Sequence, residues 1–307
     1  MNLRVFDSLG KEGGTTREVS SRLGLDLRAT GILLDALAAL RLLDKTGDAY
    51  RFSHLAETFF LSSSPRSMGG MIRFDSRLWA LWGELEDTVR TGKPVRRTAM
   101  FQEDPEETAL FMEAMDSLVR ARGDADFLAA TLDFTRFGTL LDVGAGPGTY
   151  LIAFCRAHSH LEGAIFDLPG TLSVTRRFLE REGMADRIRL IPGDYRRDPL
   201  PAGFDGIFLS NVIHGEDEAA NRRLAEKMYS ALNPGGQVMV KDHILDETRT
   251  RPAAGALFSL QMLLTTDGRD YAFSEVREWL EEAGFREVRE TVLPPPMTSS
   301  LVTAVKP

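Results

Sequence analysis

The sequence predicts an α/β protein in which a doubly wound, mostly parallel seven-stranded sheet follows a smaller α-helical domain. Three observations support this fold class. From Thr139 onward, apolar runs of strand length alternate with helix-like segments, which is typical of a doubly wound sheet. The first run ends in LLDVGAGPGTY, which indicates a strand, a glycine turn and the start of a helix. Before Thr139 the apolar residues recur mainly at helical spacing.

The composition is that of an ordinary globular protein. The 307 residues are enough for two domains, and 43% hydrophobic with 27% charged residues is a typical balance. The net charge of −8 argues against a nucleic-acid-binding surface. No apolar run approaches the roughly 20 residues of a membrane span, and the first residues lack the apolar core of a signal peptide. Because the single cysteine, Cys155, excludes an internal disulfide and a multi-cysteine metal site, we expect a cytoplasmic, disulfide-free enzyme or regulator.

The first 64 residues or so have the layout of a winged helix-turn-helix domain. Thr15 and Glu18 have capping-box spacing ahead of a helix that runs to Leu23. A second helix begins near Asp26, and a turn at 45–48 leads into a short strand. Helical spacing predicts that the buried face of this second helix consists of Ile32, Leu33, Ala36, Leu37 and Leu40.

The opposite face of that helix decides whether DNA binding is plausible. It would present Thr30, Leu34, Asp35, Ala38 and Ala39. A recognition helix needs donors and cations on its outer face, whereas this face is mostly apolar. The pattern therefore favours contact with a protein over contact with DNA.

Residues 65 to about 135 are predicted to form further helices, with a break at Gly92-Lys93-Pro94. One segment is apolar over most of its circumference, so it must be buried on several sides. Its apolar residues are Met68, Met71, Ile72, Phe74, Leu78, Trp79, Leu81, Trp82 and Leu85, and a later helix adds Phe111, Met112 and Met115. A dimer interface, the wall of a pocket for a flat hydrophobic molecule, or plain core would each account for them.

The strands of the sheet follow. Five are predicted at 140–143, 164–167, 188–191, 206–209 and 238–242. Two more, near 288–292 and 301–305, are joined by a short loop that carries three prolines. So short a connection allows only an antiparallel pair.

The glycine turn after the first strand predicts a ligand site. Gly144, Gly146 and Gly148 follow the acidic residue Asp142 at alternate positions. Glycine is needed where the backbone takes positive φ or lies directly against a ligand, and open α/β sheets bind ligands at the carboxyl ends of their strands. A plain glycine-rich loop is the alternative, and the GxGxG spacing differs from the GxGxxG of dinucleotide-binding proteins.

Acidic residues end the next two strands. Asp167, roughly 20 residues past the glycine turn, could accept hydrogen bonds from both hydroxyls of a ribose. Asp194 could accept from an exocyclic amino group while Tyr195 packs on a purine. Either acid alone could instead be a helix cap or a turn residue. Together, at the ends of successive strands, they predict a nucleoside-containing ligand.

His214 lies just past the fourth strand, on the same edge of the sheet. Its imidazole could take the proton of a phenol near neutral pH, or it could cap the following helix. Asp242, which closes the fifth strand, or Asp270, in a polar turn, could hold the ring in one tautomer and orientation, or could bind a substrate hydroxyl. His243 is expected on the opposite face of its strand from Asp242, and no HExxH or comparable spacing predicts a metal site.

Several segments together resemble one family, the two-domain S-adenosylmethionine (SAM)-dependent O-methyltransferases of the plant caffeate type. The segments are ATGILLDALAALRLLDKTGDAYRFS, LDVGAGPG, FDLPG, GDY, HGEDE, NPGG and EAGF. Bacterial members of this family act on polyketides, hydroxyquinones, carotenoids and tetrapyrroles. The resemblance covers nearly the whole chain. It implies a winged-helix dimerisation domain with a helical extension in residues 1–98, and a Rossmann-like class I methyltransferase domain in residues 99–307.

The resemblance also implies roles for single residues. His214 falls on the family's catalytic base, and Asp242 and Asp270 fall where the plant enzymes carry two flanking glutamates. SAM would be bound by Asp142, Gly144, Gly146, Asp167, Leu168, Asp194, Tyr195 and Ser210. Met115 and Met262 fall on methionines that line the substrate pocket, and Trp79, Met112 and Thr266 are further candidate substrate contacts.

The chain departs from the family pattern beside the predicted base. Gly215 and Glu216 replace the usual aspartate and tryptophan, and Ser210 stands where a lysine or arginine commonly contacts SAM. The resemblance implies methyl transfer to a hydroxyl of a small aromatic or quinonoid substrate by a homodimer, without a metal, nucleic acid or a membrane. Carbon methylation, use of SAM without methyl transfer, and a winged-helix transcriptional regulator are the alternatives.

Overall fold

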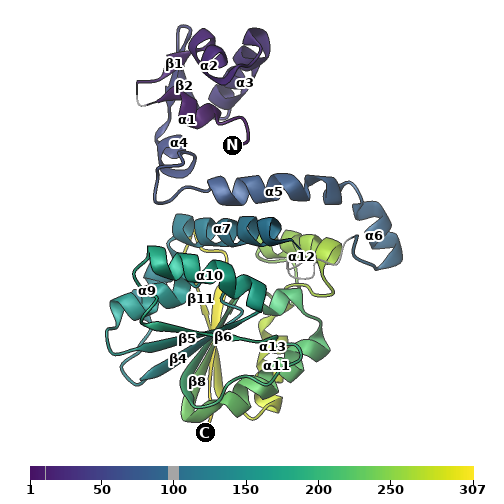
Figure 1. Cartoon of the computed structure of the whole chain (residues 1–307). Helices are drawn as coiled ribbons and strands as arrows, with labels where there is room; N and C mark the ends of the chain where they lie inside the picture. Colours follow the sequence, from purple (N-terminus) through teal and green to yellow (C-terminus); the bar gives the residue numbers. More distant parts are fainter. Residues whose placement is uncertain (11, 96–103) are drawn as a thin grey trace. The chain divides into compact units, whose positions relative to one another are not determined.

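The computed structural model of the chain describes residues 1–10, 12–95 and 104–307. The chain divides into two compact units (Figure 1). The N-terminal unit comprises Met1–Arg77 and Glu113–Arg122, and the second unit comprises Leu78–Met112 and Gly123–Pro307. The domain boundary predicted after residue 98 lies outside the described residues.

The N-terminal unit contains a small helical domain with a wing. Its elements are α1 (Val5–Leu9), β1 (Gly14–Thr15), α2 (Thr16–Leu23), α3 (Leu27–Ala39), β2 (Leu43–Thr46), β3 (Ala49–Phe52) and α4 (His54–Phe59). The three strands form an antiparallel sheet in the order β1-β3-β2. The predicted capping box is confirmed, because Glu18 N donates to Thr15 Oγ1 and Thr15 N donates to Glu18 Oε2.

The predicted buried face of α3 is right for Leu33 and Leu37, which pack against the domain core, and wrong for Ile32 and Leu40. Leu34 and Thr30 are 0% and 2% exposed, whereas Ile32 and Leu40 are 58% and 68% exposed. The helix is apolar over most of its circumference, so two adjacent stripes fit the helical period equally well and spacing alone cannot choose between them. One consequence is that large apolar side chains remain on the surface of this domain.

Four helices connect this domain to the sheet: α5 (Gly69–Trp82), α6 (Leu85–Thr91), α7 (Pro105–Arg122) and α8 (Asp124–Thr131). The predicted break follows α6, where Gly92 takes a φ of +66°. In the apolar segment of α5, Phe74 and Leu78 are buried, but Trp79 is 81% exposed. Plain core therefore accounts for only part of that segment.

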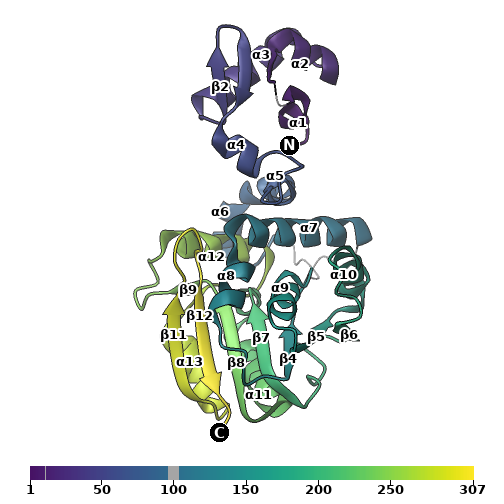
Figure 2. The same cartoon turned by 90° about the vertical axis from the view of Figure 1, so that its left-hand side faces the viewer.

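The second unit is built on a seven-stranded sheet in the order β11-β12-β8-β7-β4-β5-β6 (Figure 2). The strands are β4 (Thr139–Val143), β5 (Glu162–Asp167), β6 (Ile188–Pro192), β7 (Phe204–Ser210), β8 (Leu232–Asp242), β11 (Arg286–Val292) and β12 (Ser300–Val305). Strands β4, β5, β6, β7 and β8 are parallel to one another, and β12 is antiparallel to both β8 and β11. The predicted fold class, its seven strands and the antiparallel pair are confirmed.

Helices cover both faces of this sheet. On one face lie α9 (Thr149–Ala157) and α10 (Pro169–Arg181), and on the other lie α11 (Glu218–Ala231) and α13 (Phe273–Glu282) (Figure 1). Helix α8 packs against α9. The chain runs from β4 outward to β6 and then returns to β7 on the other side of β4. Strands β4 and β7 thus form the switch point at whose carboxyl ends doubly wound proteins bind ligands.

Two short strands and a helix complete the unit. They are β9 (Ile244–Leu245), which pairs in parallel with β10 (Tyr271–Ala272), and α12 (Ala253–Thr265). None of the helices in the described part of the chain is long and apolar enough to span a membrane.

Candidate active site

The glycine turn after β4 places half-buried main chain at the carboxyl edge of the sheet. Gly144 and Gly146 take φ values of +66° and +56°, which other residues adopt only under strain. A Cβ on Gly144 would also lie 3.0 Å from Val212 Cγ2, in the segment that follows β7. Gly146 N donates to Asp167 Oδ2 at 2.9 Å, so the turn is fixed to the end of β5.

Two buried carboxyl groups lie beside this turn. Asp142 is 1% exposed, its Oδ1 accepts no hydrogen bond from any described residue, and burial raises its pKa well above the ordinary range. Burial also raises the pKa of Asp167 to about 6, although Gly146 N and Leu168 N donate to it. Buried acceptors with spare capacity beside a turn of glycines fit a ligand that brings hydroxyl or amino donors, as a nucleoside does.

The residues after β6 are tied to the segment after β7. Tyr195 OH donates to Glu216 Oε1 at 2.8 Å, and Arg196 Nε donates to the same oxygen at 2.7 Å. Glu216, which departs from the family pattern, is therefore the acceptor that joins these two segments. Asp194 Oδ1 accepts from Arg196 N at 2.9 Å, so its carboxylate also stabilises the local turn.

Beside Ser210 the structure contains a buried cation that the sequence did not reveal. Ser210 lies in register with Lys241 on the neighbouring strand. Lys241 Nζ is 3.1 Å from Asp124 Oδ2, and both side chains are 1% exposed. A lysine within a strand is normally solvated, and only the tertiary structure brings α8 against it. The positive charge at this edge is thus on β8, where it is neutralised by Asp124.

His214 is held by a buried carboxylate. It lies in a 3-10 helix, Ile213–Gly215, and its Nδ1 is 2.7 Å from Oδ1 of Asp242, which is 0% exposed. Burial lowers the pKa of His214, but the charge of Asp242 and the hydrogen bond to it outweigh burial, so the net pKa is raised. His214 Nε2 forms no hydrogen bond with a described residue, which leaves it available to a substrate.

Three residues that the sequence did not single out shape the turn around His214. Asn221 Nδ2 donates to Ile213 O at 2.9 Å, and Tyr271 OH donates to Glu216 O at 2.6 Å. A Cβ on Gly268 would lie 2.7 Å from Glu216 N and closer still to His214 O. Their only sequence signal was proximity to the motif, because their contacts depend on how α11 and the 268–271 segment pack.

Asp270 and His243 lie differently from what the sequence predicted. The strand ends at Asp242, and His243 N turns back to donate to Asp242 Oδ1 at 2.8 Å. Strand alternation therefore stops there, and the His243 ring lies 6.5 Å from the His214 ring, so the predicted opposite placement is wrong. Asp270 Oδ2 is 3.7 Å from His243 Nδ1, and neither of its oxygens accepts a hydrogen bond from a described residue. Burial raises the pKa of Asp270 to about 8.

The candidate substrate residues are spread over the chain. Met112 is buried against Val174 and Phe178 of α10, and its Sδ lies 3.5 Å from the position of a Cβ on Gly146. Met262 is buried on α12, and Thr266 Oγ1 donates to its carbonyl at 2.9 Å. Met115 is a half-buried residue of the N-terminal unit, and Trp79 is exposed on α5. The substrate roles of these residues remain predictions.

One group among the described residues has the composition of a metal site. Ligand atoms of His214, Asp242 and Asp270 lie within 4.8 Å of one another. They could hold a divalent cation, but the hydrogen bond between His214 and Asp242 also accounts for their arrangement.

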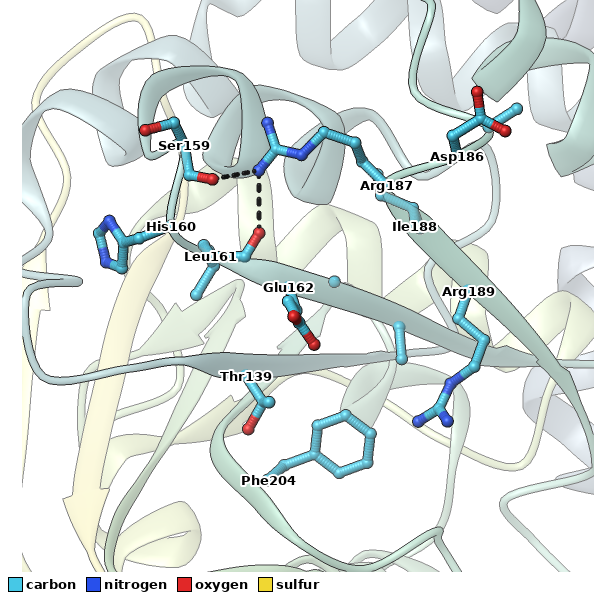
Figure 3. A pocket seen from close by; sticks show the side chains of 13 residues that line it. Thr139, Ser159, His160, Leu161, Glu162, Asp186, Arg187, Ile188, Arg189 and Phe204 are labelled. Carbon is cyan, nitrogen blue, oxygen red and sulfur yellow. Dashed lines mark hydrogen bonds between the residues drawn. The ribbon is translucent and has the colours of Figure 1, made fainter.

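A cavity of about 600 Å³ lies at the opposite edge, where the strands begin (Figure 3). It is lined by the first residues of three strands, Thr139 of β4, Glu162 of β5 and Ile188 of β6. Arg187 donates to the carbonyls of Ser159 and Leu161, each at 3.0 Å, and so stabilises the loop before β5. This cavity is remote in the fold from the glycine turn.

Buried acceptors at a glycine turn and an ionisable histidine on the same edge of a doubly wound sheet define a class: enzymes that bind a nucleoside-containing cofactor beside a reactive side chain. Comparisons with known proteins narrow this class. The profile of the O-methyltransferase domain matches residues 82–286, and that of the O-methyltransferase dimerisation domain matches residues 1–62.

Individual relatives with similar sequences or structures are also methyltransferases. The chain is 33% identical to 3-hydroxy-5-methyl-1-naphthoate 3-O-methyltransferase of Streptomyces sahachiroi, over 98% of this chain and 88% of the relative. It is 35% identical to the tetracenomycin polyketide synthesis 8-O-methyl transferase of Streptomyces glaucescens, over 98% and 90%. The crystal structure of human N-acetylserotonin methyltransferase in complex with SAM superposes with a TM-score of 0.90 at 26% identity, over 99% of this chain and 91% of that one. The chain belongs to the SAM-dependent O-methyltransferases, and it is an enzyme whose cofactor is SAM.

Proposed function

We propose that this enzyme methylates a hydroxyl of a small aromatic or quinonoid molecule, with His214 as the general base. The observation that supports the proposal most strongly is the 2.7 Å hydrogen bond between His214 and Asp242, on the edge of the sheet that bears the glycine turn. The relatives named for a hydroxynaphthoate and for tetracenomycin polyketide synthesis support an aromatic acceptor.

The glycine-turn side would hold the cofactor. SAM, when bound, supplies a sulfonium methyl group that is open to attack by oxygen. We assign its ribose to Asp167, whose buried carboxyl retains acceptor capacity. The remaining proposed contacts are Asp142, Gly144, Gly146, Leu168, Asp194, Tyr195 and Ser210.

Methylation of a hydroxyl forms a carbon–oxygen bond, breaks the carbon–sulfur bond and releases the hydroxyl proton. Neutral His214 accepts this proton, and the carboxylate of Asp242 stabilises the resulting imidazolium. General base catalysis of this kind contributes about 10²–10⁴-fold. The pKa of His214 is raised above its ordinary value of 6.5. The neutral imidazole, which is the form that accepts a proton, therefore becomes the main form only as the pH rises through that raised pKa.

The test is methyl transfer from isotopically labelled SAM to a panel of phenols, catechols and hydroxyquinones. We expect label on oxygen, seen as a methoxy signal, and its loss in His214→Ala with SAM affinity nearly intact. Label on carbon, or equal loss of turnover and SAM binding in the variant, would contradict the proposal.

We further propose that the enzyme is a homodimer through its N-terminal domain. The dimerisation-domain match and the exposed Ile32 and Leu40 within it support this assembly. The negative net charge supports a small-molecule substrate without nucleic acid, and the free, buried Cys155 supports action in the reducing cytoplasm. Light scattering of the purified protein at twice the monomer mass is the expected result, and a monomer would contradict it.

A further inference from the structure

Two imidazole–carboxylate pairs, not one, lie side by side at the histidine end of the site. The rings of His214 and His243 both pack against Phe258 of α12, with centroid distances of 4.9 and 4.8 Å. Asp242 connects the two, because its Oδ1 accepts from His214 Nδ1 and from His243 N. The second carboxyl, Asp270, lies next to His243 Nδ1. The proposed methyl transfer uses only the first pair.

The backbone of Asp270 is held in place, but its carboxyl group has no hydrogen-bond partner among the described residues. Its backbone N donates a hydrogen bond to Ser259 Oγ at 3.0 Å, and the residue is 1% exposed. Gly255 of α12 lies against it, since a Cβ there would be 3.2 Å from Asp270 Oδ2 and 3.8 Å from His243 Cβ. Neither carboxyl oxygen accepts a hydrogen bond from the described residues. Because a buried polar group without such a partner is costly, a ligand that provides one is a physical reason for its presence.

We propose that His243 and Asp270 bind a second oxygen of the substrate, next to the hydroxyl that is methylated. The substrate class is then an aromatic or quinonoid molecule with two oxygens on adjacent or peri carbons. The second oxygen is a hydroxyl, a carbonyl or a carboxyl group. This inference rests on the proposed function, because it takes His214 as the group that binds the first oxygen.

The geometry of the two pairs supports separate roles, with His214 at the first oxygen and His243 and Asp270 at the second. The ring centroids are 6.5 Å apart, so two oxygens that are close together on one ring system can be reached from both sides. His214 Nδ1 is used by Asp242, which directs the free nitrogen of His214 to one oxygen. Asp270 forms no hydrogen bond with His214, so it does not duplicate Asp242. Burial raises the pKa of Asp270 to about 8, and its carboxyl can therefore donate to a carbonyl at neutral pH.

The experiment compares matched probes that differ by one oxygen. Wild-type enzyme, Asp270→Ala, His243→Ala and Asp270→Asn are assayed with labelled SAM and with 2-naphthol, 2,3-dihydroxynaphthalene and 3-hydroxy-2-naphthoate. We expect wild type to favour the two-oxygen probes by about 10²-fold in kcat/KM, because a site built to bond an oxygen discriminates against its absence. Asp270→Ala and His243→Ala should lower kcat/KM much more for the two-oxygen probes than for 2-naphthol and so abolish that preference. Asp270→Asn, which retains a donor, should restore part of it.

The contrasting variant is Asp242→Asn, which should slow all three probes alike because Asp242 acts on the base. An equal loss for all probes in Asp270→Ala would make Asp270 a second support for His214 and would overturn the proposal.

If wild type methylates none of the probes, the proposed function has failed for them, and calorimetry on the enzyme with S-adenosylhomocysteine takes over. Tighter binding of the two-oxygen probes that Asp270→Ala removes would still support the second-oxygen site. No such preference, in turnover or in binding, would overturn it.

Discussion

The carboxyl edge of the sheet has two halves that are built in different ways. The glycine-turn half, at the ends of β4 to β6, depends mainly on the main-chain geometry of one short motif, whose glycines at 144, 146 and 148 take positive φ. Asp167, at the end of the next strand, accepts a hydrogen bond from Gly146 N in that motif. The histidine half joins side chains from three segments, at 213–216, 242–243 and 268–271. A site made by the backbone of one motif can be predicted from that motif, whereas a site assembled from distant side chains depends on how their segments pack. The predictions below test this contrast.

The largest effect is expected in the histidine half, from Asp242→Asn. Loss of the carboxylate removes the charge that stabilises the imidazolium, so we expect kcat to fall by about 10²–10⁴-fold. Asp242 raises the pKa of His214, so the acidic limb of the pH–rate profile should also move to lower pH in the variant. Rates measured from about pH 5 to 9, with SAM affinity as the control, check this. An unmoved acidic limb would show that Asp242 does not act on the titrating group.

A smaller loss is expected from Gly268→Ala, which tests the packing of the histidine half directly. The new methyl group would collide with His214 O and Glu216 N and displace the 3-10 turn. A displacement of about 1 Å can cost about 10²-fold in kcat. Gly215→Ala is the matched control, because a Cβ at that position would meet nothing within 4 Å. Equal activity in the two variants would mean that the turn tolerates displacement.

The same contrast explains what the sequence could predict. The seven strands and the glycine turn follow from local apolar runs, glycine spacing and strand-end acids, and the structure contains all of them. The placement of His243 could not be predicted, because strand alternation holds only while the strand continues, and β8 ends one residue earlier. Asp270 could not be separated from Asp242 either, since only the fold sets their distances to His214.

The sequence also could not predict that the charge of Lys241 is buried or which face of α3 packs against the core. Lys241 looks like a solvated residue until α8 places Asp124 at 3.1 Å from its ammonium. In α3 the apolar residues fit more than one stripe, so which of them meet the core is decided by packing. Both cases concern side chains whose partners are distant in sequence.

In the glycine-turn half a more modest effect is expected from Asp167→Asn. Burial raises the pKa of Asp167 from 3.8 to about 6, so the unfolded chain loses this proton at lower pH than the folded chain. The stability of the ligand-free wild type should therefore fall as the pH rises from about 4 to 6. Asparagine removes that penalty, and we expect a melting temperature higher by several degrees at neutral pH. The gain should vanish near pH 4.

In Asp167→Asn the affinity for SAM should fall, although the melting temperature of the ligand-free protein rises. Asparagine is a weaker partner for ribose hydroxyls than a carboxylate, so SAM affinity should fall by about tenfold, with kcat at saturating SAM nearly unchanged. Thermal melts at two pH values and calorimetry with SAM check both parts. A fall in kcat with unchanged SAM affinity would place Asp167 in the chemical step and not in the cofactor cradle.

The smallest effect, none, is expected from removal of metal ions. The ligand atoms of His214, Asp242 and Asp270 are close enough to hold a cation, but a cation on His214 Nδ1 would displace its hydrogen bond to Asp242. A general base needs that bond, so excess EDTA should leave the rate within about twofold, and added Zn²⁺ should inhibit until EDTA is supplied. Activity that EDTA abolishes and Mg²⁺ restores would instead make the three residues metal ligands. In that case the histidine half would be organised by an ion and not by a hydrogen bond.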